Sequence, residues 1–135
     1  MSLVLDASAA IAWFFEDERS TETDALLDRV ATEGAIVPTL WKIEIANGLQ
    51  MALRRKRIDR PYRDKALAQL AALPIETDSE TALHAWTAAL ELADRHALTV
   101  YDAVYLELAM RKRYPLASLD KDLVEAGRRA GLPTT

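Results

Sequence analysis

The sequence predicts an α/β fold, with a short central parallel sheet of four or five strands flanked by helices in three layers. Short apolar runs alternate with longer helical patterns, which is typical of a parallel sheet covered on both faces. The chain has 135 residues, of which 50% are hydrophobic and 28% charged, enough for one buried core. No linker, repeat or low-complexity segment interrupts the pattern, so we expect a single domain over residues 1–135.

The first half of the chain predicts two strands and four helices. The strands are expected at 3–5 and 35–37, and the helices at 9–15, 20–33, 40–56 and 60–73. Ser8 and Thr39 are expected to cap the first and third helices, because their hydroxyls can accept an N–H of the first turn. Gly34 is expected to end the second helix, and Pro61 suits the first turn of the fourth.

The second half predicts two or three more strands. They are expected at 74–76 and 115–118, with 132–134 as a candidate edge strand. Thr77 and Glu80 have the spacing of a capping box, which predicts one long helix reaching about Arg95. Two further helices are expected at 101–113 and 121–130, the second ended by Gly131.

Composition excludes several functions. The absence of cysteine excludes disulfides, thiolate metal sites and a cysteine nucleophile. No basic leader precedes the first apolar run, and no apolar run approaches the ~20 residues of a membrane helix, so we expect a soluble, cytoplasmic protein. The net charge of −4 argues against nucleic-acid binding when taken alone, but a cluster of metal-binding carboxylates would account for it.

Two acidic residues directly follow predicted strands. Asp6 follows strand 3–5, and Asp120 follows strand 115–118. Because ligands of open parallel sheets bind beyond the carboxyl ends of the strands, both acids are candidates for one shared site. The alternative is that each caps the helix that follows it. Asp122 is a further oxygen ligand or a first-turn acid favoured by the helix dipole.

Two more acids lie on or beside apolar helix faces. Glu44 borders the apolar face that holds Trp41 and Ile45. If its carboxylate is buried there, a nearby cation is needed to stabilise it; the alternative is that it reaches water or pairs with an arginine. Asp102 shares the inward arc of its helix with Tyr101 and Tyr105, whereas Glu107 is expected to point outward. Asp102 also has the spacing of a capping box with Thr99, and the two interpretations are compatible.

Oxygen ligands without histidine or cysteine favour Mg²⁺ or Mn²⁺ over zinc. His84 and His96 fall outside the acidic pattern.

Four segments, in this order, resemble those of PIN-domain ribonucleases, most closely the VapC-like toxins of type II toxin–antitoxin systems. They are Leu3–Val4–Leu5–Asp6–Ala7–Ser8–Ala9, Glu44–x–x–Asn47–x–Leu49, Thr99–x–Tyr101–Asp102–Ala103–x–Tyr105–x–x–Leu108–Ala109 and Leu116–Ala117–Ser118–Leu119–Asp120–x–Asp122–Leu123. The resemblance covers essentially the whole chain and implies a PIN-like fold.

The resemblance also implies an activity and partners. It implies a Mg²⁺- or Mn²⁺-dependent endoribonuclease that cleaves cellular RNA and inhibits translation. Asp6, Glu44, Asp102 and Asp120 would be its catalytic and metal-binding quartet, with Ser8 and Ser118 as supporting hydroxyls. The family further implies a homodimer and a cognate VapB-like antitoxin whose arm reaches the acidic cleft.

A basic segment is the candidate RNA contact. Arg54, Arg55, Lys56 and Arg57 end the predicted helix that carries Glu44, where cations also favour the helix dipole. A solvated helix end is therefore an equally good interpretation.

Two alternatives to the nuclease remain open. One is a phospho-accepting receiver-like domain, although Ala7 stands where that fold wants a second acid. The other is a non-catalytic PIN-like module that binds a partner, with the apolar run 13–15 as a surface. Core or dimer packing explains such an apolar run more simply.

Overall fold

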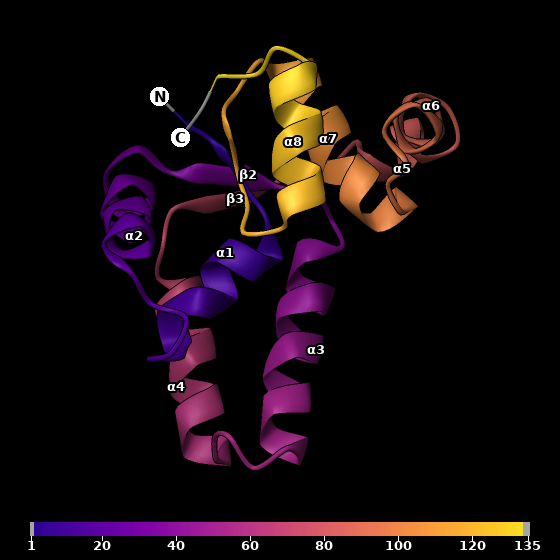
Figure 1. Ribbon diagram of the computed structural model, residues 1–135. Coiled ribbons are helices and arrows are strands. Elements are labelled where there is room, and N and C mark those ends of the chain that lie inside the picture. Colours follow the sequence, from indigo (N-terminus) through magenta and orange to yellow (C-terminus); the bar gives the residue numbers. More distant parts are fainter. Residues whose placement is uncertain (1, 134–135) are drawn as a thin grey trace.

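The protein forms a parallel sheet of four strands surrounded by helices, as a computed structural model that describes residues 2–133 (Figure 1). The strands are β1 (Val4–Leu5), β2 (Ala35–Val37), β3 (Ile75–Thr77) and β4 (Leu116–Ala117). The helices are α1 (Ala7–Ile11), the 3-10 turn η1 (Ala12–Phe14), α2 (Thr21–Glu33), α3 (Trp41–Arg54), α4 (Arg60–Ala71), α5 (Thr81–Ala85), α6 (Ala88–His96), α7 (Val100–Lys112) and α8 (Lys121–Arg129). The predicted α/β class and central parallel sheet are confirmed.

The strand order is β3-β2-β1-β4, and every pair is parallel. Val4 pairs with Ile36 on one side and with Leu116 on the other, so β1 lies inside the sheet. Leu3, Val4 and Leu5 are fully buried, which explains why this strand is a continuous apolar run rather than an alternating one.

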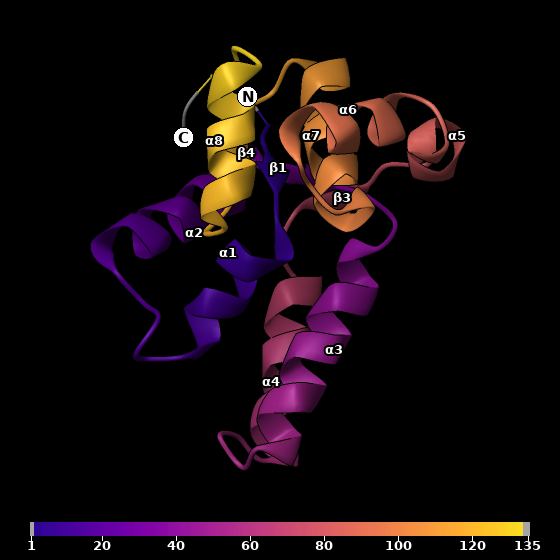
Figure 2. The same ribbon diagram turned by 45° about the vertical axis from the view of Figure 1, so that its right-hand side comes forward.

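Helices cover both sides of the sheet. In both ribbon views α2 lies on one side and α5, α6 and α7 lie on the other (Figures 1 and 2). Helices α3 and α4 form a hairpin that projects away from the sheet, with the basic segment at its far end (Figure 2). None of the helices among the described residues combines the length and apolarity needed to cross a bilayer.

Two predicted helix caps are wrong. Helix α1 begins at Ala7 rather than Ala9, and Asp6 is its N-cap residue without a side-chain cap. The Ser8 hydroxyl donates to Asp6 instead, at 2.7 Å. Helix α3 begins at Trp41 without a side-chain cap, and the Thr39 N–H donates to Thr81 Oγ1 at 3.0 Å. The Ser8 hydroxyl therefore serves Asp6 rather than the first turn of α1, and the contact at Thr39 is made by its backbone rather than by its hydroxyl.

The predicted capping box of Thr77 and Glu80 is also wrong. Thr77 ends β3, and the expected long helix is divided into α5 and α6. The division falls at Thr87, whose φ of −119° and ψ of −95° are not helical. Neither proline nor glycine marks this break, so local sequence signals could not reveal it.

The candidate edge strand at 132–134 is not observed at Leu132 and Pro133, and Thr134 lies outside the described residues. Gly131 adopts a φ of +78°, and the N–H of Leu132 bonds back to the Gly127 carbonyl at 3.1 Å. These contacts form a Schellman motif, which directs Leu132 back onto α8 instead of along the sheet.

Candidate metal centre

One pocket of about 290 Å³ brings the four predicted acids together. They come from the end of β1, from α3, from the first turn of α7 and from the residue before α8. The lining residues are Asp6, Ala7, Ser8, Ile11, Glu44, Asn47, Gly48, Asp102 and Asp120.

The sheet topology explains why the pocket forms here. Chain connections run from β1 to β2 to β3 in one direction and then return past β1 to β4. The carboxyl ends of β1 and β4 therefore meet at a topological switch point, the usual ligand position in open parallel sheets. Asp6 follows β1 and Asp120 stands three residues after β4, so strand order alone brings these two acids to the same edge.

Hydroxyl groups hold the carboxylate of Asp6, which is 5% exposed. Its Oδ2 accepts from Ser8 Oγ at 2.7 Å and from Ser118 Oγ at 2.6 Å. Ser118 Oγ also accepts the Asp120 N–H at 3.0 Å. The two serines therefore link Asp6 to the loop after β4 and lie beside the acids.

A buried tyrosine holds Glu44. The hydroxyl of Tyr105, which is fully buried, donates to Glu44 Oε1 at 2.5 Å. Burial raises the pKa of Glu44; Tyr105 opposes that rise, and repulsion from Asp6 and Asp102 adds to it. The pKa of Tyr105 is raised by burial and by its bond to Glu44, so the tyrosine stays protonated and acts as the donor.

Asp102 and Asp120 are both at helix starts and both in the pocket. Thr99 caps α7 by accepting the Asp102 N–H at 3.2 Å, and Asp120 caps α8 by accepting the Leu123 N–H at 3.0 Å. Burial raises the pKa of Asp102, followed by repulsion from Asp120 and Asp6. A place at a helix start is therefore compatible with a place in the pocket for both residues.

The donor chemistry of this pocket fits a divalent cation. Its lining contains four carboxylates and no lysine, arginine or histidine. Repulsion from neighbouring carboxylates adds to the effect of burial in raising the pKa of Glu44 and of Asp102, which indicates an unbalanced negative charge. In the part of the chain that the structure describes, no three acidic or histidine side chains form a ready-made metal cage. The four acids share a pocket, but among residues 2–133 no three of them lie close enough together to enclose a cation.

The structure does not bring the basic segment to this pocket. Arg54 lies ten residues after Glu44 on α3, about 15 Å along the helix axis. Arg57 is engaged elsewhere: it donates to Asp17 at 2.9 Å and lies 4.3 Å from the centre of the Phe15 ring. Asp122 is not among the lining residues, although its charge contributes to the raised pKa of Asp102.

Two predicted orientations on α7 are wrong. Tyr101 is 67% exposed, and Glu107, expected to face water, is 6% exposed. Every residue from Ala103 to Ala109 is buried, because α7 packs against β1, β4 and three other helices. The prediction assumed that this helix has one buried and one exposed face, and that assumption is wrong for α7.

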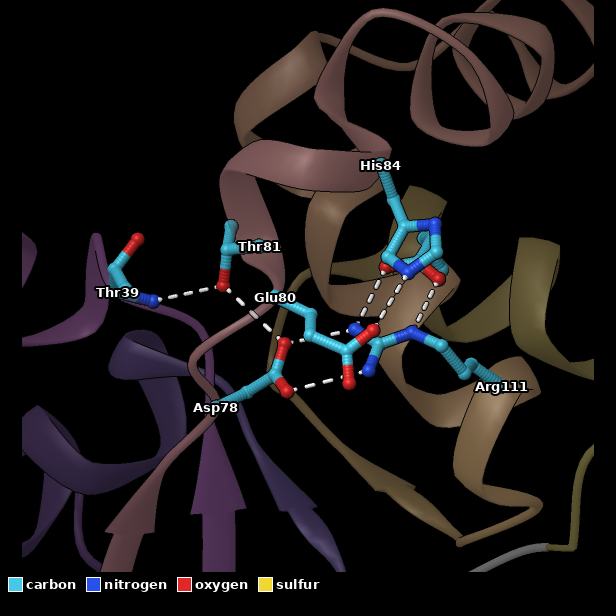
Figure 3. A network of polar contacts seen from close by, with 7 residues as sticks. Thr39, Asp78, Glu80, Thr81, His84 and Arg111 are labelled. Atoms are coloured by element: carbon cyan, nitrogen blue, oxygen red, sulfur yellow. Dashed lines mark hydrogen bonds and ion pairs between the residues drawn. The ribbon is translucent and has the colours of Figure 1, made fainter.

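Glu107 belongs to a buried ionic network that the sequence patterns missed. Arg111 donates to Glu107 at 2.8 Å. It also donates to Asp78 at 2.7 Å and thereby ties α7 to the end of β3 (Figure 3). Asp78 is also within 3.5 Å of the Thr81 hydroxyl, which accepts the Thr39 N–H. The spacing of Glu107 and Arg111, four residues apart on a helix, was the available signal.

Comparison with known proteins identifies the family. Residues 3–129 match the PIN domain, and the chain belongs to the PIN-domain family. Within known proteins, it is similar to Ribonuclease VapC3 of Pyrobaculum aerophilum, with 31% identity over 129 residues that cover 93% of this chain and 94% of that protein. The crystal structure of PAE2754 from Pyrobaculum aerophilum has a TM-score of 0.70 and 23% identity, and covers 99% of this chain and 92% of that one, which shows a shared fold.

The family match confirms the resemblance seen in the sequence and argues against a receiver-like signalling domain. The family does not by itself decide between a nuclease and a non-catalytic module. That decision rests on the chemistry of the pocket.

Proposed function

We propose that the protein is a Mg²⁺- or Mn²⁺-dependent endoribonuclease, the toxin of a type II toxin–antitoxin system, which cleaves cellular RNA and inhibits translation. The observation that carries this proposal is the pocket lined by Asp6, Glu44, Asp102 and Asp120 without a cationic side chain. The similarity to a protein named as a ribonuclease, over nearly the whole chain, supports the reaction class.

The four carboxylates are the groups that would hold the cation, because hard divalent cations prefer oxygen ligands. When bound, such a cation supplies Lewis-acid activation of water and neutralises charge on the phosphate oxygens.

The surrounding residues orient these carboxylates. Ser8 and Ser118 both donate to Oδ2 of Asp6, so Oδ1 is the oxygen that could bind a cation. Tyr105 donates to Oε1 of Glu44 and leaves Oε2 available in the same way. Preorganisation of this kind lowers the cost of assembling a charged site, since each acid is already held before any ligand arrives.

We further propose that Arg54, Arg55 and Lys56 contact the RNA backbone away from the pocket, with Arg57 as a supporting residue. The first three are exposed at the far end of α3, where they can meet phosphates without pairing with the acids of the pocket. Arg57 is the weakest of the four candidates, because its guanidinium already pairs with Asp17 and Glu18.

The proposed biological setting is a cytoplasmic homodimer held inactive by a VapB-like antitoxin. Co-expression with the product of the neighbouring reading frame tests the antitoxin, since capture of a stable complex that no longer cleaves RNA is the expected result. Light scattering of the purified protein tests the dimer.

The activity is tested by incubating the purified protein with cellular RNA in Mg²⁺, in Mn²⁺ and in EDTA. We expect cleavage only with a cation, and none with Asp102→Asn. Asp94→Asn is the matched control, because Asp94 is an exposed acid on α6 outside the pocket. Cleavage by a folded Asp102→Asn variant at the parent rate would overturn the proposal. A complete lack of cleavage by the parent protein with every cation would favour the non-catalytic module.

A further inference from the structure

Helix α3 presents a second polar side chain to the acidic pocket. Asn47 lies three residues after Glu44, on the same side of the helix, and lines the same pocket. It is exposed, and none of the side-chain hydrogen bonds among residues 2–133 involves its carboxamide. Its donors and its acceptor are therefore available to a ligand.

An inventory of the lining side chains shows what Asn47 adds. The four carboxylates only accept hydrogen bonds when ionised. The proton of the Ser8 hydroxyl is already given to Asp6, and its oxygen accepts the Leu119 N–H at 3.1 Å. The remaining lining side chains, those of Ala7 and Ile11, are apolar, and Gly48 has none. Asn47 is thus the lining residue with uncommitted side-chain N–H donors.

A phosphodiester oxygen can only accept hydrogen bonds, and the carboxylates offer it no donor. A ribose hydroxyl, by contrast, can donate to the carboxylates and does not need Asn47. We propose that the Asn47 carboxamide binds the RNA backbone at this pocket by donating an N–H to a non-bridging phosphate oxygen. This inference rests on the proposed nuclease function and assigns a substrate-binding residue to it.

The neutral charge of asparagine suits this position. A lysine or arginine here would lie one turn from Glu44 and would pair with it, as oppositely charged residues three positions apart do. That pair would compete with a cation for the carboxylate. An amide gives the phosphate a donor and leaves the negative charge of the pocket unchanged.

The test compares Asn47→Ala and Asn47→Asp with Gln69→Glu. Gln69 is an exposed amide on α4 outside the pocket, so its substitution adds the same charge as Asn47→Asp without touching the site. Turnover of a short fluorescein-labelled single-stranded RNA gives KM and kcat. Fluorescence anisotropy with the same RNA gives Kd in an Asp102→Asn background, where the RNA stays intact.

We expect Asn47→Ala to raise KM and Kd about 10-fold, the usual loss for a hydrogen bond to a charged group, and Asn47→Asp to raise them further. Gln69→Glu should leave both unchanged. Equal KM and Kd for Asn47→Ala and the parent would overturn the inference. Weaker binding by Asn47→Asp would not rescue it, because charge repulsion alone explains that effect. An inactive parent protein would refute the nuclease function, whereas the anisotropy arm would still decide whether Asn47 binds RNA.

Discussion

Single carboxylates in the pocket are held by hydroxyl groups rather than by cations. Ser8 and Ser118 hold Asp6, and Tyr105 holds Glu44. A neutral donor orients a carboxylate without neutralising it, so the negative charge remains available to a divalent ligand. An arginine in the same place would orient the acid but would also satisfy its charge.

Tyr105→Phe removes the donor to Glu44 and keeps the buried ring. We predict a fall in kcat of about 10-fold with little change in KM, because the carboxylate loses its fixed orientation while the RNA-binding surface is intact. The free energy of unfolding should fall by about 1 kcal/mol, the usual contribution of one hydrogen bond. Tyr101→Phe, on the exposed side of α7, is the control, and an equal effect of both substitutions would refute the positioning role.

Asp102→Asn removes one of the mutually repelling charges. The pKa of Asp102 is raised by burial and then by Asp120 and Asp6, so its ionised form costs stability above that raised pKa. We predict that the variant melts a few degrees higher than the parent in EDTA at neutral pH. The gain should vanish as the pH falls below the ordinary value of 3.8, where both proteins are uncharged at this position. A lower melting temperature in EDTA at pH 7 would contradict this prediction.

At the residue scale, position along strands and helices was enough to select the four acids of the pocket. Asp6 and Asp120 were visible because they follow strands, and Glu44 and Asp102 because they border or share apolar arcs. The bond between Tyr105 and Glu44 joins residues 61 positions apart, and no local pattern encodes it. Glu107 was misplaced because it is buried beneath Arg111, whose second partner, Asp78, comes from a different element.

Among the elements, α7 combines residues of the acidic pocket with a buried ionic network. It carries Asp102 and Tyr105 to the pocket and is buried along most of its length. Arg111 near its end pairs with both Glu107 and Asp78, so one cation stabilises two buried carboxylates. The network fixes α7 against β3 at the end of the helix opposite to Asp102.

Arg111→Met would leave two buried carboxylates unpaired. We predict a loss of about 3 kcal/mol in the free energy of unfolding at pH 7, as is usual when a buried ion pair loses one partner. Hydrogen bonds from Arg111 lower the pKa of Asp78, so the stabilisation is present above the ordinary value of 3.8 and is lost as the pH falls through the lowered value. The difference between variant and parent should therefore shrink in acid.

Urea denaturation at several pH values measures this difference. Arg95→Met is the control, because Arg95 is an exposed arginine near the end of α6. A penalty for Arg111→Met that is independent of pH would show that packing, rather than charge, is what Arg111 supplies.

Gly48 allows α1 to lie close to α3. A Cβ at this position would come within 2.4 Å of Ile11 Cδ1. We predict that Gly48→Ala lowers stability slightly, because overpacking of about 1–3 kcal/mol outweighs the helix-propensity gain of about 1 kcal/mol. Adding Ile11→Val removes the opposing methyl group and should restore stability. The close contact would be contradicted if Gly48→Ala raised the free energy of unfolding by the same amount with and without Ile11→Val.

At the scale of the whole molecule, the sequence was sufficient for the fold class but not for the strand order. Alternating strands and helices indicate a parallel sheet, whereas the order β3-β2-β1-β4 depends on which crossover returns past β1. The break at Thr87 has no local marker either, whereas the turn at Gly131 follows from a local glycine signal that the sequence shows. Only the order of the strands explains why Asp6 and Asp120, far apart in the chain, share one pocket.

Charge is distributed unequally over the molecule, with acids at the switch point and bases at the far end of α3. We predict that reversing Arg54, Arg55 and Lys56 to glutamate weakens RNA binding and lowers the salt slope of log Kd by about 2, as for three lost contacts to a single strand. Metal binding should be unchanged. The same reversal at Arg95, Lys112 and Arg113, three exposed bases outside that segment, is the comparison, and an equal effect there would show that binding depends on net charge alone.

Calorimetric titration with MnCl₂ tests the metal centre most directly, because it needs neither RNA nor an antitoxin. We predict saturable binding by the parent protein, a melting temperature that rises with the cation, and loss of both in Asp6→Asn, with Asp94→Asn unchanged. A parent protein that binds no Mn²⁺ or Mg²⁺ at millimolar concentration, or an Asp6→Asn variant that binds like the parent, would contradict a cation site built from these carboxylates.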